Sequence, residues 1–226
     1  MKRLLTWTMA LGLLTSMSFV QAEQATAEIS PYEAMYKTIN MPEKVLGDDI
    51  VEVTEVFLYT CPHCYRIHPF AEKWKESVAD QKDVVFNPMP AVFSEKNTPL
   101  AKAYYMAKDL GREELHEVLF ETIHNKGKRI VTKDQVKAFF VGHGVDEKAF
   151  DKSYKSFAVD NAVRTANFLT VSYGISGVPS LIVNGKYLVL SSKTKGYKEM
   201  FNVVDYLVEK ERKLIAATAK KAKPAE

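Results

Sequence analysis

The feature that most constrains this chain is a pair of cysteines, Cys61 and Cys64, that lies between an expected strand and an expected helix. Residues 51–59 form a largely apolar run, which is typical of a strand in the buried middle of a sheet. A helix is expected to follow, because Pro62 suits a first helical turn and an amphipathic pattern continues to about residue 79. The chain has 226 residues and 2 cysteines, so it does not resemble a small scaffold held by several disulfides.

Two structural explanations of the cysteine pair are weak. A disulfide between Cys61 and Cys64 would close so small a loop that it would stabilise the fold by only about 2 kcal/mol before strain. A zinc ion would find Cys61, Cys64 and His68, with His63 nearby, but structural zinc takes four ligands and no second Cys or His pair occurs at finger-like spacing. We therefore expect no metal site.

Redox catalysis explains the pair better. At the N-terminus of a helix, the dipole and the free backbone N–H groups stabilise a thiolate, which makes Cys61 the expected reactive thiol. Cys64 lies one turn further and is the expected resolving thiol, while His63 adds a donor or a positive charge beside Cys61. A lowered thiol pKa stabilises the reduced form, so the disulfide becomes a stronger oxidant.

The rest of the sequence predicts an α/β chain in which a block of helices interrupts the strands. A second strand is expected at 84–89, and a hairpin of strands at 178–183 and 186–190 is joined by Asn184-Gly185, a strong hairpin signal. A final helix is expected at 197–215. Five helices are expected in the block. The first two cover residues 97–111 and 112–125. The third begins at the capping box of Thr132 and Gln135, the fourth is capped by Asp146, and the fifth covers residues 159–173.

Three short motifs together resemble the bacterial DsbA family: Cys61-Pro62-His63-Cys64-Tyr65, Gly177-Val178-Pro179 and Asn184-Gly185-Lys186-Tyr187. The resemblance implies a thioredoxin fold with an inserted all-helical domain. The implied regions are a thioredoxin domain at residues 44–92 and 174–215, a helical domain at 93–173, an N-terminal extension at 23–43 and a flexible tail at 216–226.

The same resemblance assigns roles to residues around the cysteines. It implies a cis peptide bond between Val178 and Pro179, placed against Cys61, where the backbone of Val178 would pair with a substrate strand. The alternative is a conventional turn proline, because X-Pro bonds prefer trans by about 0.5 to 1 kcal/mol. It also implies that Glu55 is a buried acid that shuttles protons for the buried thiol, and burial would raise its pKa. The alternative is a solvent-facing glutamate on a strand edge.

The sequence departs from the family pattern at two places. His68 replaces an acid that the family carries just after the cysteine motif, and a basic residue of the second strand is missing around Pro88. A protonated His68 would stabilise a thiolate at Cys61. We expect instead a partly buried helix histidine with no special role.

Residues 1–22 have the pattern of a secretory leader, in which Lys2 and Arg3 precede an apolar run that ends in small residues. Cleavage is expected after Ala22; a second cleavage site at residues 25–27 and a retained, membrane-anchored leader are the alternatives. Removing two bases lowers the formal net charge of +3 to +1, which gives no electrostatic footprint for nucleic acid. A periplasmic protein without stable membrane insertion is expected.

The implied activity is that of a dithiol oxidase that donates the Cys61–Cys64 disulfide to unfolded, newly exported proteins with free thiols. The resemblance further implies reoxidation by a DsbB-like inner-membrane oxidase, no bound cofactor, and a monomer. A disulfide isomerase or reductase is the first alternative, although only about 20 residues separate the leader from the first strand, too few for a dimerisation domain. The second alternative is a peptide-binding holdase in which the cysteines are incidental.

Overall fold

The computed structural model describes residues 30–39 and 49–222 of the chain. The expected leader at 1–22, the expected cleavage sites, and residues 44–48 and 223–226 lie outside the described residues. The described residues from Pro31 onward belong to one compact unit.

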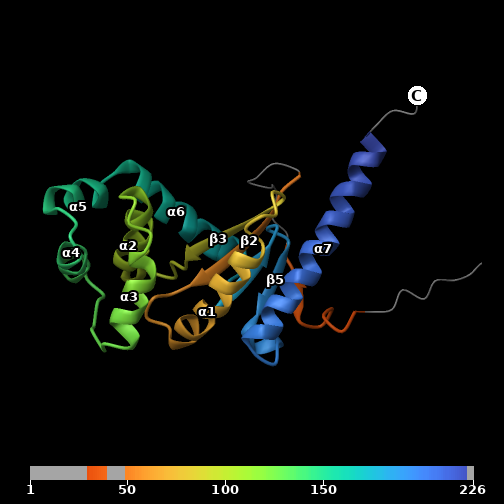
Figure 1. Cartoon of the computed structure of the whole chain (residues 1–226), viewed down its shortest axis with the longest axis horizontal. Coiled ribbons are helices and arrows are strands. Elements are labelled where there is room, and N and C mark those ends of the chain that lie inside the picture. The colour runs from red at the N-terminus through yellow and green to blue at the C-terminus, as the bar shows by residue number, and fades with distance from the viewer. Residues whose placement is uncertain (1–29, 40–48, 223–226) are drawn as a thin grey trace, which may run out of the picture. The chain divides into compact units, whose positions relative to one another are not determined.

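A five-stranded mixed sheet organises this unit (Figure 1). Its strands are β1 (Tyr36–Thr38), β2 (Val51–Phe57), β3 (Val84–Pro90), β4 (Ser180–Val183) and β5 (Tyr187–Leu190). They lie in the order β1-β5-β4-β2-β3. The strands β2 and β3 run parallel and are connected through the helix α1 (Pro62–Ser77), whereas the other neighbouring strands are antiparallel.

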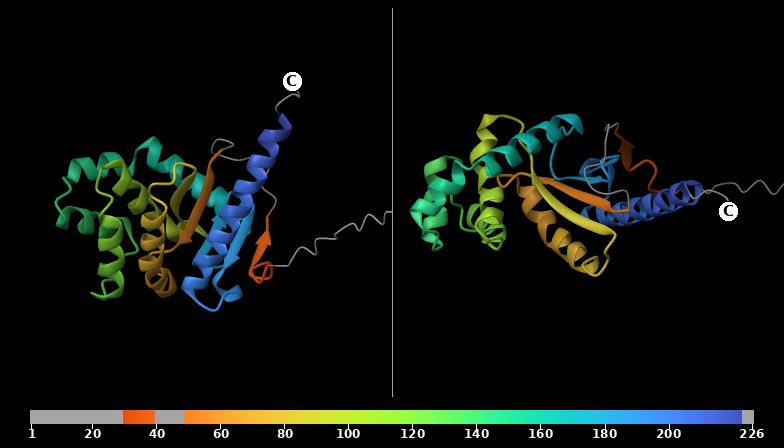
Figure 2. Two further views of the ribbon diagram at one scale, coloured as in Figure 1. Left: turned by 45° about the vertical axis from the view of Figure 1, so that its right-hand side comes forward. Right: turned by 90° about the horizontal axis from the view of Figure 1, so that it is seen from above.

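Helices cover both faces of the sheet. The helices α1 and α7 (Tyr197–Ala222) pack on one face, and α6 (Phe157–Ser172) packs with part of α2 on the other. The strand β4 is buried on both faces: Leu181 and Val183 join the first cluster and Ile182 joins the second, as the alternation of a strand requires. The view from above in Figure 2 shows α1 and α6 on opposite sides of β2 and β3.

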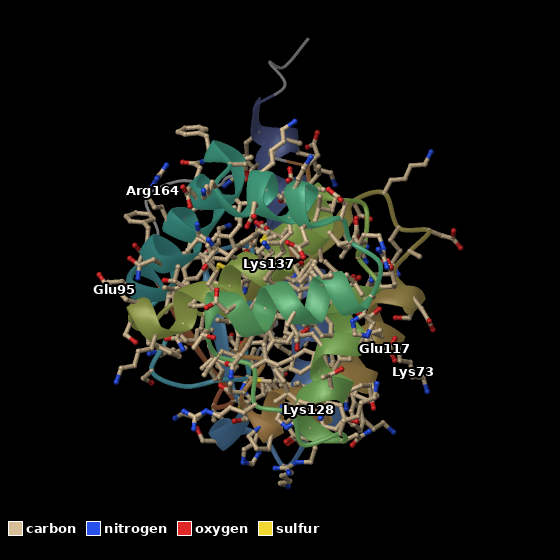
Figure 3. All side chains as sticks on the ribbon, turned by 90° about the vertical axis from the view of Figure 1, so that its left-hand side faces the viewer. Lys73, Glu95, Glu117, Lys128, Lys137 and Arg164 are labelled. Atoms are coloured by element: carbon tan, nitrogen blue, oxygen red, sulfur yellow. The ribbon has the colours of Figure 1, made fainter. Side chains whose placement is uncertain are left out.

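A block of helices separates β3 from β4, as the sequence predicts. Its elements are η1 (Glu95–Asn97), α2 (Thr98–Asp109), α3 (Leu115–His124), α4 (Lys133–Gly142), α5 (Glu147–Tyr154) and α6. The capping box of Thr132 and Gln135 is confirmed, and the Asp146 side chain accepts the N–H groups that open α5. Figure 3 looks onto this block, with Lys137 of α4 near its centre.

The Asn184-Gly185 hairpin forms as predicted. Both residues have a positive φ, 56° and 65°, which is the backbone conformation of a two-residue type I′ turn. The N–H of Lys186 closes the turn on the carbonyl oxygen of Val183. Outside the turn, β4 and β5 pair from Ser180 to Leu190, so β4 begins two residues later than expected.

Other elements also differ from the sequence prediction. The expected N-terminal extension contributes β1, a strand of three residues that pairs with β5 and is too short to show a periodic pattern. The helix α6 begins at Phe157, because the Ser156 side chain accepts the N–H of Val159. The helix α7 runs beyond Ile215 to Ala222, since residues 216–222 are mostly Ala and Lys, which favour helix.

Among the described residues, no helix combines the length and the apolar character needed to cross a lipid bilayer.

Candidate active site

The reactive cysteine lies at the junction between the end of β2 and the start of α1. Cys61 is the N-cap residue of α1, with extended backbone angles (φ −89°, ψ 116°), and Pro62 occupies the first turn. The N–H of Cys61 donates to the carbonyl oxygen of Leu58 at 3.0 Å, which closes the loop between strand and helix. Pro62 and His63 are exposed, Cys61 is half-buried, and Cys64 is buried. The site therefore presents one accessible sulfur and keeps the other inside.

The two thiols have opposite electrostatic environments, and both are free in this structure. The pKa of Cys61 is lowered from 9.0 to about 5, mainly because the Cys64 thiol donates a hydrogen bond to it. Burial opposes this shift, while the N–H groups of Cys64 and His63 and the charge of His63 add to it. The pKa of Cys64 is strongly raised, because its proton is held by Cys61 and its sulfur is buried. Cys61 is the thiolate and Cys64 the thiol of this pair.

The downstream motif lies against Cys61. The Cys61 Sγ atom is 3.6 Å from the carbonyl oxygen of Val178, although the residues are 117 positions apart in the sequence. The Val178–Pro179 peptide bond is cis. Because β4 begins only at Ser180, the main chain at Val178 lies outside the ladder of the sheet, next to the reactive sulfur.

His63 is held by two side chains that the sequence analysis did not identify. Its Nδ1 atom lies 3.1 Å from the Tyr197 hydroxyl and 3.1 Å from Nη2 of Arg66. A guanidinium can only donate, so Nδ1 is the acceptor in the contact with Arg66 when the His63 ring is neutral. Arg66 is three residues after His63 on the same helix and was within reach of sequence reasoning. Tyr197 begins α7 and gave no such signal.

Glu55 is buried, with 2% of its surface exposed, so the solvent-facing alternative is wrong. The alternation of β2 places it on the same side as Val53, the side that α1 covers. Burial, together with the charge of Glu72, raises its pKa to about 8. Pro88 lies opposite Glu55 on β3 and supplies no charge to offset this. The charge of Glu55 contributes in turn to the raised pKa of Cys64.

His68 is buried in α1, more deeply than the sequence analysis expected. Its ring packs against His116 and Phe120, with ring centroids 5.1 Å and 5.2 Å away. Burial lowers its pKa, which favours the neutral ring. In the part of the chain that the structure describes, no three His, Cys, Asp or Glu side chains gather in a way that would hold a metal ion.

An aromatic and histidine cluster supports the loop before Cys61, and sequence reasoning missed it. The Tyr59 hydroxyl lies 2.7 Å from Nδ1 of His116, and Nε2 of His124 lies 2.7 Å from the carbonyl oxygen of Tyr59. The His124 ring also stacks on Tyr65, the residue after Cys64, with ring centroids 4.8 Å apart. These contacts join α3 to the cysteine loop, and residues 57 to 65 positions apart carry no local sequence signal for them.

Comparison with known proteins agrees with this geometry. A family model described as a DSBA-like thioredoxin domain matches residues 71–208. The protein named thiol:disulfide interchange protein DsbA from Pseudomonas aeruginosa is 34% identical over 219 residues, which is 96% of this chain and 98% of that protein. The protein of the same name from Azotobacter vinelandii is 37% identical over 163 residues, 72% of this chain and 75% of that protein.

Solved structures of this family are similar as well. The crystal structure of Pseudomonas aeruginosa DsbA matches with a TM-score of 0.74 and 34% identity, covering 83% of this chain and 95% of that one. The DsbA oxidoreductase from Xylella fastidiosa matches with a TM-score of 0.70 and 31% identity, covering 78% and 95%. The predicted thioredoxin fold with an inserted helical domain is thereby confirmed. The chain belongs to the DsbA-like thioredoxin family of thiol-disulfide oxidoreductases.

Proposed function

We propose that this protein oxidises the thiols of unfolded, newly exported proteins in the periplasm by donating the Cys61–Cys64 disulfide. A thiolate of the substrate attacks the Cys61 sulfur, the Cys61–Cys64 bond breaks, and Cys64 leaves with the electron pair. A second substrate thiolate then attacks the substrate sulfur of the mixed disulfide, and Cys61 leaves as a thiolate. Two electrons pass from the substrate dithiol to the cysteine pair, and no bound cofactor is needed.

The observation that carries this proposal is the contrast between the two sulfurs. A thiol with a low pKa is a good leaving group, and the pKa of Cys61 is about 5. The second step therefore runs readily toward an oxidised substrate and a reduced enzyme. Cys64 takes up a proton when it leaves, and Glu55 is a buried carboxyl whose raised pKa suits it to supply that proton.

The substrate would be held beside Cys61 by main-chain contacts at Val178. The carbonyl oxygen of Val178 lies beside the reactive sulfur, outside the sheet ladder. An extended peptide joined to Cys61 can accept and donate hydrogen bonds there without regard to its side chains. This supports a broad range of unfolded substrates.

Completion of the cycle requires an acceptor for the two electrons. We propose a DsbB-like inner-membrane oxidase as that acceptor and a monomer as the working form. Membership of the family supports both proposals. Reoxidation assays with membranes test the first, and sedimentation of the purified protein tests the second.

The direct test uses the oxidised protein and a reduced, unfolded substrate with two cysteines, and it counts the substrate thiols lost with time. The parent is expected to oxidise the substrate stoichiometrically, and Cys61→Ser is expected to be inactive. With Cys64→Ser, a substrate cysteine activated as a mixed disulfide with an aromatic thiol should be captured at Cys61. The Cys61 thiolate attacks the substrate sulfur, the aromatic thiolate leaves, and a stable mixed disulfide remains. Full activity of Cys61→Ser would overturn the proposal in favour of a peptide-binding holdase. Reshuffling of a scrambled substrate without net oxidation would favour an isomerase.

A further inference from the structure

A cavity of about 530 Å³ lies beside the loop that leads to Cys61. Its volume is within the range of about 300 to 1,000 Å³ that is usual for ligand pockets. Buried apolar residues from the end of β3 and from α2 form part of its wall, namely Pro90, Ala91, Leu100 and Ala101. Leu58, Tyr59 and Thr60 form the side toward the cysteines. We call this cavity the Arg129 pocket.

The charged side chains that line the Arg129 pocket are all basic: Lys96, Arg129 and Lys133. Lys133 lies over the ring of Tyr154, 5.1 Å from its centroid. The side chains of Lys96 and Arg129 make no ion pair or hydrogen bond with any other described residue. The nearest acids in sequence, Glu95 and Asp134, do not line the pocket. Two unpaired cations beside an apolar wall favour an anionic group carried on an apolar stem.

The ends of two helices add to this positive potential. The first residues of α2 and of α4 border the pocket, and the N-terminus of a helix carries a partial positive charge. This contribution alone would not define a site. It has the same sign as the charge of the three side chains and adds to their attraction for an anion.

The pocket is within reach of a chain attached to Cys61. Thr60 lines the pocket and is the residue directly before Cys61, and consecutive Cα atoms are about 3.8 Å apart. A volume of about 530 Å³ corresponds to a sphere about 10 Å across. At about 3.3 Å per residue, an extended peptide spans that width in about three residues.

We propose that the Arg129 pocket is a substrate subsite that takes a Glu or Asp side chain located about three residues from the cysteine that reacts with Cys61. The inference rests on the proposed function and adds a preference to it: among exported polypeptides, those with an acidic residue near the reacting cysteine are oxidised faster. The apolar wall packs against the stem of the acidic residue, while Lys96 and Arg129 pair with its carboxylate.

The experiment compares two single-cysteine peptides that differ at one position three residues from the cysteine, where one has Glu and the other Gln. For each peptide, the rate constant is measured for attack of the peptide thiolate on the Cys61–Cys64 disulfide, which forms a mixed disulfide at Cys61 and releases Cys64. The measurement is made on the parent and on the double variant Lys96→Gln and Arg129→Gln. Dividing the Glu/Gln rate ratio of the parent by that of the variant cancels any difference in intrinsic thiol reactivity between the peptides.

A matched control carries Lys126→Gln and Lys128→Gln, which remove the same charge from exposed residues that do not line the pocket; Lys128 is labelled in Figure 3. We expect the parent to prefer the Glu peptide by about fivefold, which is about 1 kcal/mol, the size expected of exposed ion pairs. The double variant should lose this preference and the control should keep it, with the pKa of Cys61 unchanged in both.

Three results would overturn the inference: a preference retained by the double variant, an equal loss in the control, or a parent that treats both peptides alike. Failure of the parent to react with either peptide is a different result, because it would reject the proposed function itself.

Discussion

The sulfur of Cys61 lies 3.6 Å from the carbonyl oxygen of Val178. The sheet creates this proximity, because Val56 near the end of β2 pairs with Ser180 at the start of β4. Continuing each strand by a few residues brings the reactive thiol to the cis Val178–Pro179 peptide. A sulfur bound to Cys61 therefore lies next to main chain that is outside the ladder of the sheet.

The first prediction concerns the acidity of Cys61. Its thiolate absorbance in the reduced protein should titrate with a midpoint near pH 5, the pKa that its neighbours impose. His63→Ala removes the imidazole charge but leaves the backbone N–H groups, so the midpoint should rise and still stay below 9.0. His143→Ala is the control, because His143 lies in the helical block, where its ring is hydrogen-bonded to the carbonyl oxygen of Phe139. It should leave the midpoint of the Cys61 titration unchanged. A parent midpoint near 9 would contradict the assigned environment.

The second prediction concerns how pH changes the stability of the reduced form. The folded pKa of Cys61 is lowered from 9.0 to about 5. The thiolate therefore stabilises the reduced protein fully above the unfolded value, and this benefit disappears as pH falls through about 5. Urea unfolding of the reduced and oxidised forms should show the free-energy difference shift against the reduced form as pH is lowered from 8 to 4. A difference that does not change with pH would reject this account.

The third prediction concerns Glu55, whose folded pKa is raised to about 8 by burial and by Glu72. Between the ordinary value of 4.5 and about 8, the unfolded chain ionises while the folded protein keeps its proton, so stability falls as pH rises through that window. The fall amounts to about 3 kcal/mol by pH 7. In Glu55→Gln, the free energy of unfolding, measured with urea, should fall by about that much less than in the parent as pH rises from 4.5 to 8.

Glu52→Gln is the matched control for Glu55, because it makes the same substitution on the other side of β2, where Asn87 donates to the carboxylate. It should keep the pH dependence of the parent. If Glu55→Gln also keeps it, then Glu55 does not titrate in the way that its burial requires, and its proposed role as proton donor to Cys64 loses its support.

The fourth prediction concerns the hydrogen bond between Tyr59 and His116. Burial and the charges of His68 and Lys75 lower the pKa of His116 to about 3. The ring is therefore neutral at pH 7, and its Nδ1 atom shares a hydrogen bond with the Tyr59 hydroxyl. Tyr59→Phe leaves that nitrogen buried without a partner and should lower the free energy of unfolding by about 1 to 3 kcal/mol.

Tyr104→Phe serves as the control for Tyr59→Phe. The Tyr104 ring also contacts His116, but its hydroxyl makes no hydrogen bond with another described residue. Removal of the Tyr104 hydroxyl should lower the free energy of unfolding clearly less than removal of the Tyr59 hydroxyl does. Equal costs would mean that the hydroxyl of Tyr59 contributes no specific hydrogen bond.

Local signals in the sequence predicted much of this structure. The cysteine motif after a buried strand, the capping box at Thr132 and the Asn184-Gly185 turn each depend on residues a few positions apart, and each forms as expected. The strand β1 escaped prediction because its three residues are held by pairing with β5 and carry no pattern of their own.

The surroundings of the site were harder to predict, because they depend on distant parts of the chain. Glu55 has the same local sequence whether it faces water or α1, so its burial was an open question until the fold was known. The contacts of Tyr59 with His116 and His124, and of His63 with Tyr197, join residues 57 to 134 positions apart. The pocket beside Thr60 likewise needs residues from β3, α2 and the loop before α4.

The measurement that tests the account most directly is the reduction potential of the Cys61–Cys64 couple, obtained by equilibration with glutathione buffers at pH 7. Because the Cys61 thiolate stabilises the reduced form, the potential should lie well above the value of about −270 mV of thioredoxin. Such a value would establish the pair as an oxidant of other proteins. A potential at or below that of thioredoxin would show that the pair is a reductant or a structural bridge, and would contradict the proposed function while leaving the fold unchanged.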